Sequence, residues 1–198
     1  VFMAGQRDFK RMLAYSSVEH MGILVLGIGL GGIAVFGSLL HVINNALTKV
    51  VLFLSAGNIH RAYRSKNLNE VSGALRRLPV SGALFLTGFL AITGSPPFGP
   101  FISEFTILNG AMLGRHYVAA GMFLLFLIMI FIGMGATVLH VVQGPPSPAA
   151  AQTDFRDGFL NTAPLLIALA LVVMMGVWIP APLYAFVERA ARLLEAAP

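Results

Sequence analysis

Cysteine is absent from the 198 residues, and charged residues make up only 11% of them. Without cysteine the chain can form no disulfide, no thiolate metal site and no iron–sulfur cluster, which excludes redox centres of these kinds. The low charge content and the hydrophobic fraction of 57% lie outside the range of soluble globular domains. We therefore expect an integral membrane protein in a lipid bilayer, with any electron chemistry carried by a partner.

The net charge of +5 does not indicate a nucleic-acid partner. Basic residues flank the apolar stretches instead of gathering in a polar module, and this is how topology determinants of membrane proteins are distributed. The first residues, VFMAGQRDFKR, lack the basic, apolar and small-residue regions of a signal peptide. Because the chain starts abruptly on Val1, we expect it to be the C-terminal part of a longer subunit.

Apolar stretches predict an all-α integral membrane fold of about six transmembrane helices, forming one transmembrane domain of residues 1–198. Five stretches are long enough to cross a hydrocarbon core, and they cover about residues 12–32, 35–58, 78–95, 117–142 and 161–181. A sixth stretch, 98–114, follows the sequence GSPPFGP, whose prolines and glycines break helices. We expect this span to be discontinuous and covered by protein. Residues 182–198 predict an amphipathic helix at the membrane interface.

The distribution of basic residues predicts an orientation. With six crossings, only Arg156 of the loop residues falls on one side of the membrane, and eleven of the 13 basic residues fall on the other. The positive-inside rule then places both termini and residues 59–77 in the cytoplasm of a bacterium, with residues 143–160 outside its inner membrane. The eleven residues are Arg7, Lys10, Arg11, Arg61, Arg64, Lys66, Arg76, Arg77, Arg115, Arg189 and Arg192.

A polar stripe runs through the otherwise apolar segment from Ser38 to Ser55. On a helix, His41, Asn45 and Lys49 lie on one face. A lysine near the middle of a span costs about 2.5–3.5 kcal/mol on insertion scales, so it usually faces a bundle interior or water and marks an ion pathway.

Four more titratable residues fall within the predicted spans: Glu19, His20, Glu104 and His140. Each has a structural alternative, such as pairing with the basic edge, satisfying the loosened backbone after the prolines, or lying at the interface. Several costly intramembrane groups together favour one explanation, a proton relay. Lysine, histidine and glutamate suit such a relay, since their proton affinities can be brought near neutral pH by burial. No metal-ligand cluster, phosphate loop or activated nucleophile is recognisable, so we expect no metal and no cofactor.

Three segments resemble successive landmarks of a known family: QRDFKRMLAYSSVEHMG (6–22), LHVINNALTKVVLF (40–53) and LAITGSPPFGPFISEF (90–105). They are similar to the antiporter-like membrane subunits shared by respiratory complex I (NADH:quinone oxidoreductase), Mrp-type cation/proton antiporters and complex I-related membrane-bound hydrogenases. The forms SSVEHMG and SEF are most similar to the large membrane subunit of hydrogenase-4 or formate hydrogenlyase.

The resemblance implies the second half of a fourteen-helix inverted-repeat fold. Lys10, Lys49 and Glu104 match the lysine of the DxKR motif, the lysine of the central polar axis and the charged residue of the second broken helix. His41 matches the first of a histidine pair, whereas Asn45 stands where the family usually has the second. A water molecule would then bridge His41 and Lys49.

The function that the resemblance implies is proton translocation within a complex I-like or hydrogenase assembly, in a subunit of an oxidoreductase that is not catalytic alone. The implied partners are the missing N-terminal half and other membrane subunits. Two alternatives stay open: a cation/proton antiporter subunit of the Mrp type, in which sodium also moves, and a truncated fragment that packs against partners and conducts nothing.

Overall fold

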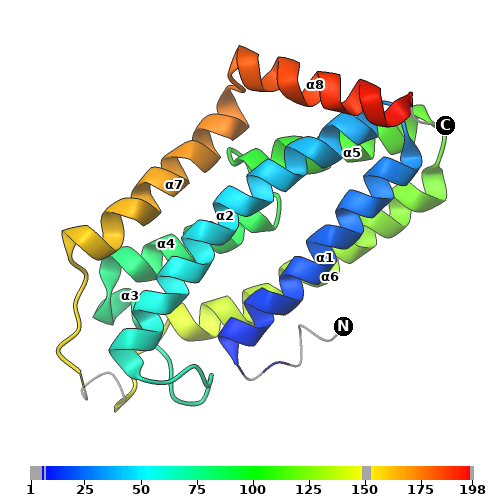
Figure 1. Cartoon of the computed structure of the whole chain (residues 1–198). Helices are drawn as coiled ribbons and strands as arrows, with labels where there is room; N and C mark the ends of the chain where they lie inside the picture. The colour runs from blue at the N-terminus through cyan, green and yellow to red at the C-terminus, as the bar shows by residue number, and fades with distance from the viewer. Residues whose placement is uncertain (1–5, 7, 149–152, 197–198) are drawn as a thin grey trace.

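The computed structural model describes residue 6, residues 8–148 and residues 153–196, and these form a helical bundle (Figure 1). The elements are α1 (Phe9–Leu30), α2 (Ile33–Tyr63), α3 (Ala74–Arg77), α4 (Pro79–Ile92), α5 (Gly99–Leu113), α6 (Tyr117–Val142), α7 (Phe159–Val177) and α8 (Ala181–Glu195). Across these residues, extended pairing is limited to one isolated bridge between Asp8 and Asn67. The predicted all-α membrane fold is confirmed.

Four helices are long and apolar enough to cross a membrane: α1, α2, α6 and α7. Helices α4 and α5 have only 14 and 15 residues. At 1.5 Å per residue each is about 21–23 Å long, which is less than the roughly 30 Å of a hydrocarbon core. Neither helix can therefore cross alone.

Helices α4 and α5 form the two halves of one crossing that runs antiparallel to α2. Near the start of α2, Ala34 packs against Gly110 of α5, and near its middle Asn44 donates a hydrogen bond to Gly99 O at 2.8 Å. Further along α2, Leu52 lies against Gly88 of α4. The break between the two halves, residues 93–98, therefore lies at the depth of the middle of α2.

The expectation of a discontinuous helix is thus confirmed, but the count of six separate crossings is wrong, because stretches 78–95 and 98–114 share one. The bundle has five crossings among the described residues. The proline-rich turn lies at the depth of the middle of α2 instead of at a membrane surface. Phe98 and Gly99 are buried, whereas Pro96 and Pro97 are exposed, so the described residues cover the turn only in part.

The two long loops meet at the end of the bundle where α1 begins. Gly73 N donates to Gln143 O at 2.8 Å, and Val80 N donates to Asp157 Oδ2 at 2.9 Å. The expectation that residues 59–77 and 143–160 lie on opposite sides is therefore wrong. Because five is an odd number of crossings, α8 lies at the far end of the bundle from Asp8, and the expectation that both termini share one side is wrong as well.

Helix α1 starts from a capped and charge-paired residue. The Asp8 carboxylate accepts hydrogen bonds from Lys10 N and Arg11 N, and it pairs with Lys66 Nζ at 3.2 Å. Burial alone would raise the pKa of Asp8, but these hydrogen bonds and the lysine charge hold it below the ordinary 3.8. The cap joins the start of α1 to the loop after α2.

Candidate functional site

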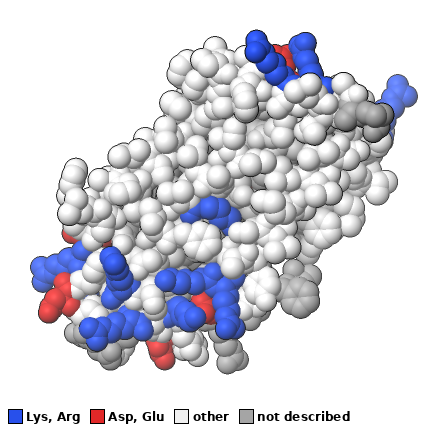
Figure 2. Space-filling model, in the orientation of Figure 1, with Lys and Arg blue, Asp and Glu red and all other residues white. Residues whose placement is uncertain are grey.

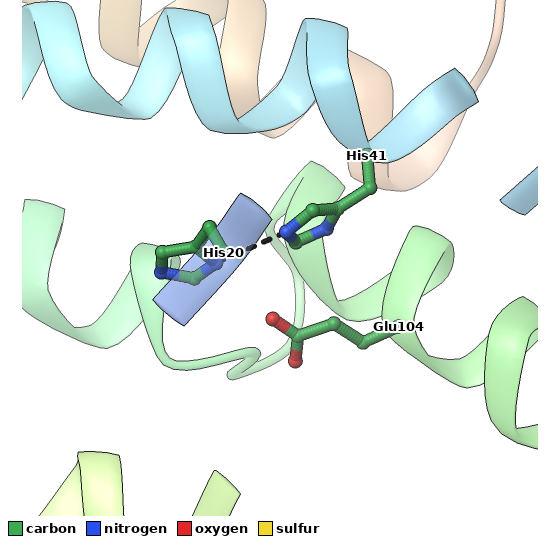
Figure 3. Close-up of side chains that lie close together, drawn as sticks. All are labelled: His20, His41 and Glu104. Carbon is green, nitrogen blue, oxygen red and sulfur yellow. Dashed lines mark hydrogen bonds between the residues drawn. The ribbon is translucent and has the colours of Figure 1, made fainter. Parts of the chain in front are cut away.

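Three buried titratable side chains from three helices meet beside the broken crossing (Figure 3). His20 comes from α1, His41 from α2 and Glu104 from α5. His20 Nδ1 and His41 Nε2 are 3.0 Å apart and share a hydrogen bond, and the two rings are stacked with centroids 5.2 Å apart. One ligand atom from each of the three residues lies within 4.8 Å of the others.

His41 also reaches the first turns of α5. Its Nδ1 lies 3.0 Å from Ser103 Oγ, which in turn donates to Pro100 O at 2.9 Å. Asn44 Nδ2 donates to Gly99 O on the same turn. Both carbonyl groups lie in the first turn of α5, where they can also accept from backbone N–H groups one turn later. The side-chain bonds therefore add to the helix's own bonds, and they tie the break to α2.

Glu104 lies against the other side of the break. A Cβ atom on Gly94 would overlap Glu104 Oε2, and Gly94 has φ of +69°, a conformation that glycine adopts without strain. Within the described part of the chain, Glu104 Oε1 and His20 Nε2 are buried without a hydrogen-bond partner. An unpaired buried polar group is costly, so each of these atoms calls for a physical explanation, of which a functional role is one.

Lys49 lies on α2 two turns beyond His41, about 12 Å along the axis. Its Nζ donates to Leu13 O at 3.0 Å and to Ser16 Oγ, both on α1. Ser16 is four residues before His20, so the two side chains lie on one face of α1. The lysine is therefore connected toward the histidine pair through α1 and not along α2.

The other predicted residues lie apart from this arrangement or at its margin. Asn45 is buried, and its Oδ1 has no partner among the described residues. Glu19 is half-buried next to His20. Lys10 lies in the first turn of α1 at the charged end of the bundle. His140 is near the end of α6, where its Nε2 bonds to Leu68 O at 2.8 Å.

Three polar residues of the site were missed by the sequence analysis: Ser16, Asn44 and Ser103. The sequence offers only a weak signal for two of them. Ser16 lies four residues before His20, which is one helical turn, and Ser103 directly precedes Glu104. The triad of His20, His41 and Glu104 also has ligand types that could hold a metal ion, which was not expected.

On the face that Figure 2 shows, charged side chains gather at the two ends of the molecule. The end where α1 starts carries Lys10, Arg11, Arg61, Arg64, Lys66, Arg76, Arg77 and Arg156, and the end with α8 carries Arg115, Arg189 and Arg192. Lys49 is left between them, as expected for a relay residue and not for a topology determinant.

Residues 2–133 match the family described as NADH:quinone oxidoreductase/Mrp antiporter, transmembrane. The chain is 34% identical over 192 residues to hydrogenase-4 component F homolog of Methylacidiphilum infernorum, covering 96% of this chain and 39% of that protein. It is 27% identical over 172 residues to a Na(+)/H(+) antiporter subunit of Alkalihalophilus pseudofirmus, covering 86% and 35%.

Solved structures have the same fold. A chain of the Mrp complex from Dietzia sp. DQ12-45-1b superposes with a TM-score of 0.85 at 19% identity, covering 98% of this chain and 44% of that one. A chain of respiratory complex I from Thermus thermophilus superposes with a TM-score of 0.83 at 24% identity, covering 98% and 41%. The chain thus spans less than half the length of these relatives, and the resemblance identified from the sequence motifs is confirmed. It belongs to the NADH:quinone oxidoreductase/Mrp antiporter family of membrane subunits.

Proposed function

We propose that these residues translocate protons across the membrane through a buried polar path that runs from Lys49 to the broken crossing. The observation that carries the proposal is the hydrogen bond between His20 and His41, because it joins two titratable rings inside an apolar bundle. Imidazole can accept a proton on one nitrogen and release one from the other, which suits a position between other relay groups.

The path has four steps. The Lys49 ammonium contacts Ser16, and Ser16 lies one helical turn, about 6 Å, from His20. A water molecule bridges that turn. His20 exchanges a proton with His41, and His41 exchanges with Ser103 or with the Glu104 carboxyl beside it. This route takes the place of the expected water bridge between His41 and Lys49, since Asn45 cannot relay a proton.

The charge distribution supports one orientation. Eight basic residues of the described chain lie at the Asp8 end and three at the α8 end, so the positive-inside rule favours the Asp8 end in the cytoplasm of a bacterial inner membrane. Lys49 is then nearer the cytoplasm, and His41 and Glu104 lie further toward the outside. Glu104 lies beside the break, near the middle of the membrane.

The surroundings of Lys49 support the presence of a further protein segment against α2. It is only partly buried, and exposed apolar residues, including Val50 and Phe53, surround it on α2. A lysine facing lipid at this depth is costly, so another protein segment covers this face in the working assembly. We propose that the segment is the N-terminal half of the same subunit, and that the assembly is of the hydrogenase or complex I-like type, as the name of the first relative suggests.

A second candidate is cation/proton exchange, because another relative is named as part of a Na(+)/H(+) antiporter. Sodium distinguishes the two candidates in sealed vesicles that contain the full-length subunit in its assembly. Exchange requires that an imposed sodium gradient drives proton movement, whereas pure proton translocation is insensitive to it.

The proposal is tested by replacing Lys49 in that assembly. Lys49→Met keeps the apolar volume and removes the exchangeable proton, so we expect proton translocation to be abolished while the assembly stays intact. Lys49→Arg should fail too, since a guanidinium does not release its proton near neutral pH. Lys66→Met, at the exposed charged end, is the matched control and should stay near wild type. Full translocation by Lys49→Met would refute the proposal.

A further inference from the structure

Helix α8 has an apolar surface wider than its contact with the rest of the bundle. Val187 and Ala191 are buried, and Leu183 and Val187 pack in one cluster with Leu40 of α2 and Met175 of α7. Phe186 and Leu193 are apolar too, yet they are 68% and 73% exposed. The contact with the bundle therefore leaves a second apolar strip uncovered.

The two strips point in different directions. At about 100° per residue, Phe186 and Leu193 lie on one side of Val187, some 100–120° away from it around the helix. Glu188 and Glu195 lie about 80–100° away on the other side. With Val187 against the bundle, one flank of α8 is thus apolar, and the opposite flank is charged, since Glu188 pairs there with Arg192 at 2.8 Å.

The position of α8 in the bundle determines whether each flank faces lipid or water. Figure 1 shows α8 lying across the end of the bundle, where the ring of Tyr184 contacts Phe36 at 5.0 Å, three residues after the start of α2. Trp178, directly after α7, is 63% exposed. Tryptophan and tyrosine concentrate at the boundary between headgroups and acyl chains. Helix α8 lies at that level.

We propose that α8 is an interfacial anchor, with Phe186 and Leu193 inserted among lipid acyl chains and the flank with Glu188 and Glu195 facing water. Leu183 and Val187 pack against the side of the first turns of α2, in a cluster with Leu40. A helix packed in this way has one flank toward the bilayer core and the other toward water. The two arginines and two glutamates of α8 cancel, so apolar contact and not attraction to anionic lipid holds the helix.

The alternative occupant of the exposed strip is another protein subunit. Spin labelling separates the two, and the absence of native cysteine in these 198 residues makes each introduced cysteine unique within them. The variants are Phe186→Cys and Leu193→Cys, with Glu195→Cys as the control on the charged flank. Each is labelled in the full-length subunit in its assembly, reconstituted into phosphatidylcholine and phosphatidylglycerol vesicles.

We expect labels at 186 and 193 to collide several-fold more with oxygen, which dissolves in acyl chains, than with an aqueous nickel chelate. The label at 195 should show the reverse preference. Labels at 186 and 193 that are shielded from both reagents would show a covering protein, and chelate-accessible labels would show water. Either result would overturn the proposal. Because the readout does not involve proton movement, it is independent of the proposed transport function.

Discussion

At the residue scale, the site concentrates groups that are costly to bury. His20, His41 and Glu104 are all at least 96% buried, and each would need a hydrogen-bonded partner to be stable in a purely structural role. His41 has two such partners, whereas His20 Nε2 and Glu104 Oε1 have none among the residues described. The unpaired atoms are the ones expected to exchange protons.

Glu104 provides the test of this interpretation at a single residue. Glu104→Gln keeps the shape and removes the titratable proton, so we expect translocation to fall by roughly a hundredfold, the lower end of what a positioned proton-transfer group contributes. Glu104→Asp should retain part of the activity. Proton pumping by the reconstituted assembly is the measurement, and wild-type rates in the glutamine variant would leave Glu104 with a structural role only.

Titratable residues can be identified from the sequence alone when they fall in a membrane span, because placing them there costs free energy. The sequence was therefore sufficient to identify four separate candidates: His20, His41, Lys49 and Glu104. It could not predict that His20 contacts His41, since this contact depends on how α1 packs against α2. The same limit applies to Ser16, which joins Lys49 to α1. Serine is inexpensive to bury in a helix, where its hydroxyl can bond a backbone carbonyl, so its presence carries little signal.

At the element scale, α4 is held in place by a residue from a distant loop. Its N-cap residue, Leu78, has no side-chain hydrogen-bonding group, and Asp157 takes over that role by accepting from Val80 N and Ser81 N at 2.9 and 3.2 Å. Asn58 of α2 donates to Ser81 Oγ at 3.0 Å in the same place. The first half of the broken crossing is thereby fixed to α2 and to the loop before α7.

We predict that Asp157→Ala lowers the free energy of unfolding by about 1 kcal/mol, the usual cost of losing an aspartate cap. Thermal unfolding in detergent measures the effect. Asp154→Ala is the matched control, because Asp154 is an exposed aspartate in the same loop, and its melting temperature should equal that of wild type. Equal melting of the Asp157 and Asp154 variants would exclude the cap.

The proline-rich sequence GSPPFGP is enough to predict a discontinuous helix, but not its depth. Each half-helix is apolar, so hydropathy alone predicts a crossing for each. The number of crossings depends on how the two half-helices pack against α2. Three contacts follow one another along α2: Gly110 with Ala34, Gly99 with Asn44, and Gly88 with Leu52. Such pairing between segments far apart in sequence cannot be read from hydropathy.

At the scale of the whole molecule, the five crossings give a topology that labelling can test. Cysteines introduced at Lys66 and Asp154 should react with a membrane-impermeant maleimide from the same side of sealed vesicles, because their loops are hydrogen-bonded to each other. A cysteine at Arg115, in the turn between α5 and α6, should react from the opposite side. Labelling of positions 66 and 154 from opposite sides would restore six crossings.

The most direct test of the account is the rate of proton translocation when His20 is replaced. His20→Gln preserves the size and polarity of the side chain but cannot take up a proton, and it should reduce translocation by the reconstituted assembly roughly a hundredfold. His140→Gln is the control, because His140 is exposed and bonded only to Leu68 O among the described residues, and it should pump like wild type. Unchanged translocation in the His20 variant, with the assembly intact, would contradict the path through the buried histidine pair.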